Sequence, residues 1–359
     1  MGLVLILFMS RTFYKALGKT ETWPDLTGIY ASSLTYDDVY LVPQNSNIAS
    51  RSEVDTTITI GPYTLTKPII TAPMDTISGE KMIRELARLG ALGSLPRGNF
   101  AERLKICKKL VKDKIPCLYA IGLKEGIEEA RQLTKAGAKL LVIDVAHGGS
   151  IPAQNLAQKL KKKYKNIFVM VGNIVTYDEA ESYKKHDIDI AKVGVGPGGM
   201  CTTRIVAGNG FPQLSAVFEV TESGLPVVAD GGIKQPGDFA KAIAAGATCM
   251  MAGSIFAGTD ETPGEYTPSG NKVVRGQASS EYMKDQGIVT NEFRAAEGVS
   301  VEVPPKGPVE QVVKRLMGGL RSAMTYAGAR NIPEFQKKAQ FIIVSSSAKE
   351  EGKPWIKSM

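Results

Sequence analysis

Eight short apolar runs alternate with stretches of helical periodicity along most of the chain, and this alternation constrains the fold more than any other feature. Apolar strands separated by helices indicate a parallel sheet that is buried on both faces. Eight strand–helix units predict a (β/α)8 barrel, with a doubly wound sheet as the alternative architecture. The runs occupy residues 68–73, 91–96, 117–122, 139–145, 167–173, 188–196, 225–232 and 248–253.

Polar or glycine residues end nearly every one of these runs. In a (β/α)8 barrel the carboxyl ends of all strands meet on one face, and active sites lie there. The expected face carries Asp75, Gly122, Asp144, Gly172, Asn173, Gly194, Asp230 and Gly253. The concentration of such residues at strand ends favours the barrel over the doubly wound sheet.

A long irregular segment, residues 258–305, follows the eighth run. Loops of this length are usually lids or binding loops, and we call this segment the flap. We expect a single catalytic domain at 34–345 that includes the flap, and a C-terminal tail at 346–359. Residues 1–33 are expected to form an extension that is partly disordered, or whose start is misassigned with Met9 as the initiator.

The composition is that of a soluble globular protein, with 43% hydrophobic and 22% charged residues among 359. The net charge of +8 suits an anionic ligand but is weak evidence for a nucleic-acid partner. The apolar start at residues 1–9 is too short to span a bilayer and lacks the features of a signal peptide. The four cysteines form no C-x-x-C pair, so neither a zinc site nor a disulfide framework is predicted. We expect a cytoplasmic protein that binds neither nucleic acid nor membrane.

The sixth run leads into the loop GPGGMCTTR, residues 196–204, which places a cysteine among glycines. A cysteine thiolate is a strong nucleophile, which makes Cys201 a candidate for covalent catalysis. Thr203 lies two residues further on, close enough to help move a proton. The uncovered backbone of the loop could bind a monovalent cation through carbonyls or a phosphate through amides. A flexible glycine loop with an incidental cysteine is the alternative.

The seventh and eighth runs end in residues suited to a phosphorylated ligand. The carboxylate of Asp230 can accept hydrogen bonds from two neighbouring hydroxyls, as in a ribose. Gly231 and Gly232 follow the seventh run, and Gly253 and Ser254 follow the eighth. Many barrels bind phosphate at these two positions, so we expect a phosphate group here.

Several motifs in a fixed order resemble the IMP dehydrogenase/GMP reductase family, and the resemblance runs from about Leu34 to about Val344. It is carried by LTYDDVYLVPQ (34–44), APMDT (72–76), VIDVAHG (142–148), GNIVT (172–176), KVGVGPGGMCTTR (192–204), PQLSAV (212–217), ADGGI (229–233) and GGLRSAMTYAGA (318–329). The resemblance implies an oxidoreductase of purine metabolism in which Cys201 attacks C2 of a purine nucleotide.

Two features distinguish the branches of this family. Residues 97–116 alone separate the second and third runs, which leaves no room for the regulatory domains usual in the dehydrogenase branch. The chain contains no Arg-Tyr dipeptide, the pair that serves the dehydrogenase for hydrolysis, and has Lys284, Asp285 and Gln286 at the corresponding place. EFRAAEG, residues 292–298, resembles the reductase branch instead. The resemblance therefore implies reductive deamination of GMP to IMP with NADPH.

The resemblance also implies the roles of individual residues. Cys201, Thr203 and Glu297 are expected to be catalytic, and a potassium ion is expected on the backbone carbonyls of Gly196, Gly198, Cys201 and Arg204. Substrate contacts are expected from Asp230, Gly231, Gly232, Gly253, Ser254, Gly276, Gln277, Ala278, Arg294 and Gly298. NADPH contacts are expected from Ser50, Arg51, Arg97, Asp144, Val145, Ala146, Ser322, Ala323, Met324 and Thr325. Ser50, Arg51 and the last four would come from a neighbouring subunit of a homotetramer.

Three departures from the family pattern leave the exact nucleotide open. Gly199 stands where the family has serine, and Gln277 and Ala278 lie within GQAS, where the reductase has GMSS. An IMP dehydrogenase without regulatory domains, a reductase for a related purine nucleotide and a non-catalytic nucleotide-binding barrel are the alternatives.

Overall fold

The computed structural model describes residues 33–288, 291–292 and 295–354. Among these residues, eight parallel strands form one sheet in the order β4-β11-β10-β9-β8-β7-β6-β5. Their bounds are β4 (Ile69–Thr71), β5 (Gly93–Leu95), β6 (Cys117–Ile121), β7 (Leu140–Asp144), β8 (Phe168–Ile174), β9 (Ile190–Val193), β10 (Val227–Asp230) and β11 (Cys249–Ala252). Each strand lies within one of the predicted apolar runs, allowing for one residue at the end of β8.

The sheet closes on itself between its first and last strands. Ile70 pairs in parallel with Leu92, just before β5. The Thr71 amide donates to the Leu92 carbonyl at 3.1 Å, and the Leu92 amide donates to the Ile69 carbonyl at 3.0 Å. Closure removes both sheet edges, and it confirms the predicted (β/α)8 barrel.

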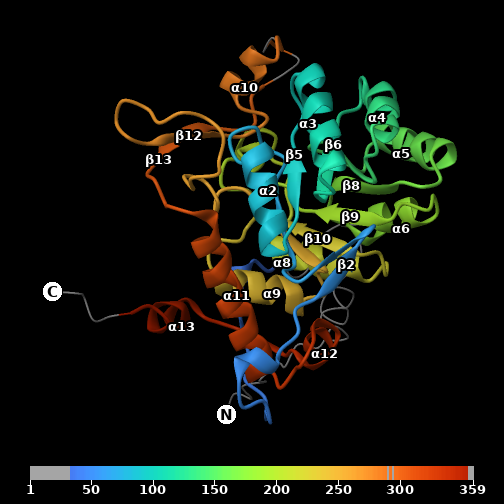
Figure 1. The fold of residues 1–359 in the computed structure, drawn as a ribbon. Coiled ribbons are helices and arrows are strands. Elements are labelled where there is room, and N and C mark those ends of the chain that lie inside the picture. Colours follow the sequence, from blue (N-terminus) through green and yellow to red (C-terminus); the bar gives the residue numbers. More distant parts are fainter. Residues whose placement is uncertain (1–32, 289–290, 293–294, 355–359) are drawn as a thin grey trace.

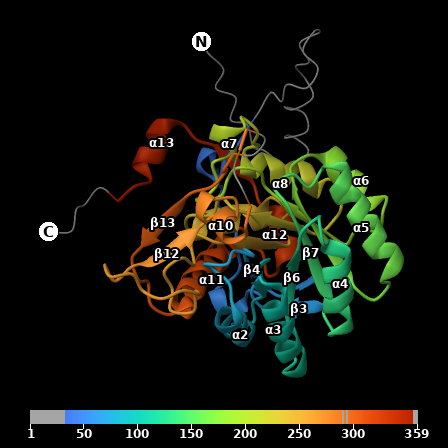
Figure 2. The ribbon, with the colours of Figure 1, turned by 90° about the horizontal axis from the view of Figure 1, so that it is seen from above.

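Helices surround the barrel (Figures 1 and 2), and along the sequence a helix follows each barrel strand. Those that follow successive strands are α2 (Glu80–Leu89), α3 (Phe100–Lys112), α4 (Gly126–Lys135), α5 (Ile151–Lys163), α6 (Tyr177–Lys184), α8 (Gln213–Thr221), α9 (Pro236–Ala244) and α11 (Val309–Tyr326). Local sequence sets their limits. The Thr176 hydroxyl accepts from the Glu179 amide at the start of α6, and the Glu179 carboxylate accepts from the Thr176 amide, which forms a capping box.

The connection from β5 to β6 contains α3 and no other helix or strand. The inserted regulatory domains of the dehydrogenase branch are therefore absent from this point of the barrel, as predicted.

Short elements also lie around the barrel, and one of them, a hairpin, covers the amino ends of two strands. β2 (Ile58–Ile60) and β3 (Tyr63–Leu65) form a hairpin, and Gly61 in its turn lies against Leu140 and Phe168, where β7 and β8 begin. β1 (Val39–Leu41) pairs antiparallel with β14 (Phe341–Ile343). The 3-10 helices η1 (Tyr36–Asp38) and η2 (Arg51–Glu53) and the helices α12 (Ile332–Lys338) and α13 (Ser346–Glu351) complete this part of the structure.

The flap contributes a second layer at the other end of the barrel. It contains β12 (Lys272–Arg275), α10 (Ser280–Asp285) and β13 (Ser300–Val303), and β12 pairs antiparallel with β13. Figure 1 shows α11 running from β13 along the side of the barrel toward α12. The limits proposed for the domain, its extension and its tail stay predictions.

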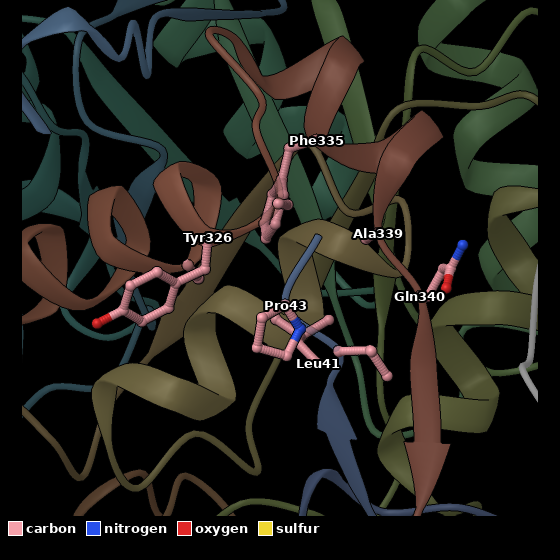
Figure 3. Close-up of a pocket in the computed structure, with 9 residues that line it drawn as sticks. Leu41, Pro43, Tyr326, Phe335, Ala339 and Gln340 are labelled. Atoms are coloured by element: carbon pink, nitrogen blue, oxygen red, sulfur yellow. The ribbon is translucent and has the colours of Figure 1, made fainter. Parts of the chain in front are cut away.

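A small apolar pocket of about 80 Å³ lies between β1, α11, α12 and the start of β14. Figure 3 shows Tyr326 and Phe335 on one side of it and Leu41 and Pro43 on the other. The loop that carries Cys201 contributes no residue to this pocket, so it is separate from the expected chemistry. No helix in the described part of the chain is long and apolar enough to cross a membrane.

Candidate active site

Cys201 lies in the loop that connects β9 to the short helix α7 (Thr203–Val206), and it is partly exposed. The other three cysteines are buried. Burial raises the pKa of the thiols of Cys107, Cys117 and Cys249, which keeps them protonated and unreactive. Cys201 is therefore the cysteine that a substrate can reach.

A chain of hydrogen bonds joins the Cys201 thiol to a carboxylate of the flap. The Cys201 Sγ donates to Thr203 Oγ1 at 3.2 Å, and Thr203 Oγ1 donates to Glu297 Oε2 at 2.7 Å. Cys201 and Glu297 are far apart in sequence, and the structure brings them together as the resemblance implied. A hydroxyl between a thiol and a carboxylate can pass a proton in either direction.

Backbone pairing holds the flap against the cysteine loop. The Thr202 amide donates to the Glu297 carbonyl at 2.9 Å, and the Val299 amide donates to the Met200 carbonyl at 3.0 Å. Gly298 lies opposite Cys201 in this short antiparallel bridge. The position of Glu297 is thus set by main-chain hydrogen bonds on both sides of Gly298.

The space around Gly298 is too small for a side chain without a shift of the neighbouring backbone. A Cβ at this position would lie 3.1 Å from the Met200 carbonyl oxygen and 3.2 Å from the Ser279 amide nitrogen. We expect Gly298→Ala to push the flap strand away from the cysteine loop and lower kcat by about 10²-fold, because small displacements of catalytic groups have effects of this size. Steady-state kinetics together with a thermal unfolding curve would measure this.

Gly237→Ala is the matched control, because a Cβ at Gly237 meets no atom within 4 Å. Its kcat should match that of the parent. An unchanged kcat in Gly298→Ala would show that the flap strand tolerates the methyl group and that the spacing at Gly298 does not set activity.

The predicted phosphate residues surround one small region at the carboxyl ends of β10 and β11. A Cβ on Gly231 would lie 3.1 Å from the Gly198 amide nitrogen, and one on Gly199 would lie 3.2 Å from the Ser254 hydroxyl. Ser254 is exposed. Two glycine-rich loops and a free hydroxyl meet here, and backbone amides with a hydroxyl are ordinary phosphate ligands. Gly232 continues the first loop, and Gly253 precedes Ser254, with Met74 against it.

The carboxylate of Asp230 already accepts two hydrogen bonds from side chains of the barrel. Its Oδ2 accepts from Lys192 Nζ at 2.7 Å and from Asn173 Nδ2 at 3.0 Å. Lys192 Nζ also lies 3.0 Å from Asp144 Oδ1. The two carboxylates expected to contact substrate and cofactor therefore share one ammonium group.

Sequence reasoning assigned no role to Lys192 or Asn173. The signal for Lys192 was a lysine in the middle of an apolar run, since a charged residue is rarely fully buried unless it is paired. Burial alone would lower the pKa of Lys192, but the carboxylates of Asp144 and Asp230 outweigh it and raise the pKa above its usual value. The ammonium group is charged throughout the physiological range.

Gln277 occupies a position between the flap and the barrel. Its Nε2 donates to the Pro73 carbonyl, and its Oε1 accepts from Arg97 Nη2 at 3.4 Å. Its amide therefore joins the flap to the ends of β4 and β5. Ala278 lies beside it, and the Ala278 carbonyl accepts from the Glu297 amide at 2.9 Å. Gly276 is buried, with the Met200 carbonyl oxygen 3.1 Å from where a Cβ would lie.

The predicted cofactor residues fall into two groups. Arg97, Asp144, Val145 and Ala146 lie at or just beyond the carboxyl ends of β5 and β7, close to the residues described above. Ser50 and Arg51 lie at η2 and pack beside α11, where Arg321 Nη1 donates to the Arg51 carbonyl at 3.3 Å. The last four predicted contacts are in the final turns of α11: Ser322, Ala323, Met324 and Thr325.

This second group does not meet Cys201 within one chain. α11 reaches its last turns at the end of the barrel where α12 lies, away from the flap (Figure 1). Met324 is fully buried, and Ala323 lines the apolar pocket of Figure 3. Arg294, predicted to contact the base, lies outside the described residues.

The cysteine loop leaves backbone carbonyls available. Within the described part of the chain, the carbonyls of Gly196 and Cys201 accept no hydrogen bond, while that of Gly198 accepts from the Cys201 amide at 3.0 Å. The Arg204 guanidinium donates to the carbonyls of Phe211 at 2.6 Å and Val195 at 3.4 Å. This side chain braces the loop, and its aliphatic part lies against Gly196.

The fold and this arrangement define a (β/α)8-barrel enzyme with its site at the carboxyl ends of the strands. The chain belongs to a particular family: the model of the IMP dehydrogenase / GMP reductase domain matches residues 33–355. This match confirms the family that the sequence motifs predicted.

Individual relatives fall on both sides of this family. GMP reductase 2 of Bos taurus is 35% identical over 336 residues, and the match covers 88% of this chain and 95% of the bovine protein. An inosine-5'-monophosphate dehydrogenase of Cryptosporidium parvum is 34% identical and covers 89% of this chain and 94% of its own. An inosine-5'-monophosphate dehydrogenase of Chlorobaculum parvum is 38% identical over 275 residues, which are 56% of its length. The chain spans about half the length of several such relatives.

A solved structure extends the comparison to the fold. A single-residue variant of the GMP reductase of Trypanosoma brucei, in complex with guanosine 5'-monophosphate, has a TM-score of 0.85 and 26% sequence identity. The match covers 92% of this chain and 99% of that one.

Proposed function

We propose that this protein is a GMP reductase, which converts GMP and NADPH to IMP, ammonia and NADP⁺. The hydrogen-bonded chain from Cys201 through Thr203 to Glu297 carries the proposal, since it joins a nucleophile to an acid–base pair. The named complex of the Trypanosoma brucei relative with guanosine 5'-monophosphate supports this substrate.

The first half of the reaction replaces the amino group at C2 of the purine. The Cys201 thiolate forms a bond to C2, and the bond from C2 to the exocyclic nitrogen then breaks. An amine does not leave as an anion, so its nitrogen must gain a proton before that bond breaks. Thr203 and Glu297 supply this proton through the relay described above.

The second half releases the enzyme. When NADPH is bound, it supplies the hydride that reduces C2. The C2–sulfur bond breaks, its electron pair returns to Cys201 as thiolate, and IMP is formed. The chain's own task in this half is to hold the purine flat against the cysteine loop and keep water out, which the pairing of Gly298 with Cys201 assists.

An IMP dehydrogenase without regulatory domains is the second candidate, because the Cryptosporidium parvum relative matches the chain almost end to end. The position of the expected dehydrogenase base argues against it. Lys284 and Asp285 on α10 and Gln286 after it are exposed, and Asp285 is paired with Arg275 at 2.6 Å. None of the three matches the Arg-Tyr pair.

A single assay separates these candidates. NADPH oxidation with GMP, followed by the absorbance of the reduced nicotinamide, should exceed NADH formation from IMP and NAD⁺. The reverse ranking would overturn the assignment. Activity on another purine nucleotide but not on GMP would indicate that Gln277 selects the base. A panel of purine nucleotides with NADPH and NADH also settles the cofactor.

Potassium fits the cysteine loop. The free carbonyls of Gly196 and Cys201, with Gly198 between them, are neutral oxygen ligands of the kind that bind this ion. The carbonyl of Arg204 is the proposed fourth ligand. The bound ion would supply a fixed positive charge that orders the loop around Cys201.

We expect GMP reduction to be faster in potassium chloride than in sodium or lithium chloride at the same ionic strength, because smaller ions fit a carbonyl cage less well. Initial rates in the three salts, with choline chloride as the control without a metal cation, would test this. Equal rates in all four would mean that these glycines serve only to bend the loop.

The remote group of cofactor residues leads us to propose a homotetramer. Ser50, Arg51 and Ser322 to Thr325 would reach the cofactor of a neighbouring subunit, since they do not reach Cys201 of their own chain. We also propose that the protein works in the cytoplasm, where its thiols stay reduced.

A further inference from the structure

Lys192 is a buried charged residue that the proposed mechanism does not use. It lies in the middle of β9, and its side chain is 4% exposed. Its ammonium group contacts carboxylates from two other strands, Asp144 at the end of β7 and Asp230 at the end of β10.

The path from Lys192 to Asp144 crosses β8, and the register of the sheet explains how. Asp144 pairs with Gly172, and Gly172 pairs with Lys192, so the three residues lie side by side across three strands. A Cβ on Gly172 would lie 2.5 Å from the Lys192 Cβ and 3.0 Å from its Cγ. The missing side chain at Gly172 is what lets the lysine reach across β8.

The contacts leave each carboxylate with a free oxygen. Lys192 and Asn173 both donate to Oδ2 of Asp230, and Lys192 contacts Oδ1 of Asp144. Within the residues that the structure describes, Oδ1 of Asp230 and Oδ2 of Asp144 accept no hydrogen bond, so they are available to hydroxyl donors. The carboxylate side chains are 18% and 13% exposed, so a ligand can reach both.

One ammonium group serves two carboxylates, which makes their positions interdependent. A donor that binds one carboxylate fixes its orientation, and the shared ammonium then fixes the other. The second ligand meets groups that are already ordered and loses less conformational entropy on binding. Linkage of this kind is reciprocal between the two sites.

We propose that Lys192 is a positioning residue that orients Asp144 and Asp230 together and thereby couples the binding of the two nucleotides. This inference rests on the proposed function, in which Asp230 contacts the ribose of the purine nucleotide and Asp144 contacts the nicotinamide cofactor. It adds a specific linkage that neither contact alone requires.

The experiment measures GMP binding with and without saturating NADP⁺, a pair that cannot complete the reaction because NADP⁺ carries no hydride. In the parent, NADP⁺ should tighten GMP binding by about fivefold or more, the range usual for coupled sites. In Lys192→Met the ratio should fall to about one, and each nucleotide should bind at least about tenfold more weakly, as expected for a lost charged partner. Isothermal titration calorimetry gives both quantities, and KM should rise in this variant more than kcat falls.

Lys161→Met is the matched control. Lys161 forms an ion pair of 2.8 Å with Asp189, just before the start of the same strand β9. Its loss should lower the melting temperature but leave both dissociation constants and their ratio at parental values. A ratio in Lys192→Met equal to that of the parent, or a parental ratio of one, would overturn the coupling.

Asp144→Asn keeps the test decisive if Lys192→Met does not fold. It retains the ammonium group and Asp230, and it too should bring the ratio to about one. A parental ratio in Asp144→Asn would count against the inference. If the parent binds no GMP, the proposed function fails, and the same titrations with IMP and NAD⁺ still test Lys192.

Discussion

Cys201→Ser should abolish GMP-dependent NADPH oxidation while GMP still binds with nearly the parental affinity. A serine hydroxyl is almost wholly protonated near neutral pH and is a poor substitute for a thiolate, so the covalent step fails. Removal of a catalytic nucleophile commonly lowers kcat by several orders of magnitude. GMP binding survives because the expected phosphate site at Gly231, Gly199 and Ser254 does not involve the thiol.

Mass spectrometry adds a direct readout to the kinetics. The parent, quenched during turnover, should carry a purine nucleotide on Cys201, and the variant should carry none. Cys249→Ala is the control, because Cys249 is fully buried in β11 and its raised pKa keeps it out of the chemistry. Turnover of Cys201→Ser within tenfold of the parent would remove this residue from the mechanism.

The barrel could be predicted from the sequence because both faces of its strands are buried. Such strands are continuous apolar runs, and helices with one apolar stripe separate them. The sequence predicts the ends of the strands less well: the apolar pattern covers 188–196 as one run, while β9 ends at Val193. Gly194, with a φ of 141°, leaves the strand, but its neighbours Val195 and Gly196 continue the apolar pattern into the cysteine loop.

The relay could be proposed from the sequence only through the resemblance to a family. Thr203 follows Cys201 closely, but Glu297 lies in a flap whose length and irregularity predict no particular contact. Its position depends on amide–carbonyl pairs at Thr202 and Val299, and backbone pairing of this kind leaves no side-chain pattern.

The shared ammonium at Lys192 could not be predicted for a related reason. The contact with Asp144 depends on the register of β7, β8 and β9, which places a glycine between the two side chains. Sequence shows a lysine in an apolar run and aspartates at strand ends, but not which of them meet. Register is fixed by packing across the whole barrel.

Glu297→Gln should block release of ammonia from GMP and still allow the thiolate to react with the purine. The amide keeps the shape of the carboxylate and can accept from Thr203 Oγ1, but it cannot hold and deliver the proton that the departing amine requires. Loss of one positioned acid–base group typically costs on the order of 10²–10⁴ in rate, so GMP-dependent NADPH oxidation should fall by this factor.

The two halves of the reaction respond differently to this change, and that difference identifies the role of Glu297. Run from IMP and NADP⁺, the hydride-transfer half forms the Cys201 adduct without moving an amine, so it needs no proton from the relay. Glu297→Gln should therefore form this adduct, detected by mass spectrometry of the quenched protein, while Cys201→Ser does not. Glu302→Gln makes the same substitution on β13, where the carboxylate contacts Ser269 and Asn271 rather than Thr203, and it should keep parental rates. Full GMP reduction by Glu297→Gln would mean that another group protonates the amine and that the hydrogen bond of 2.7 Å from Thr203 only holds the flap in place.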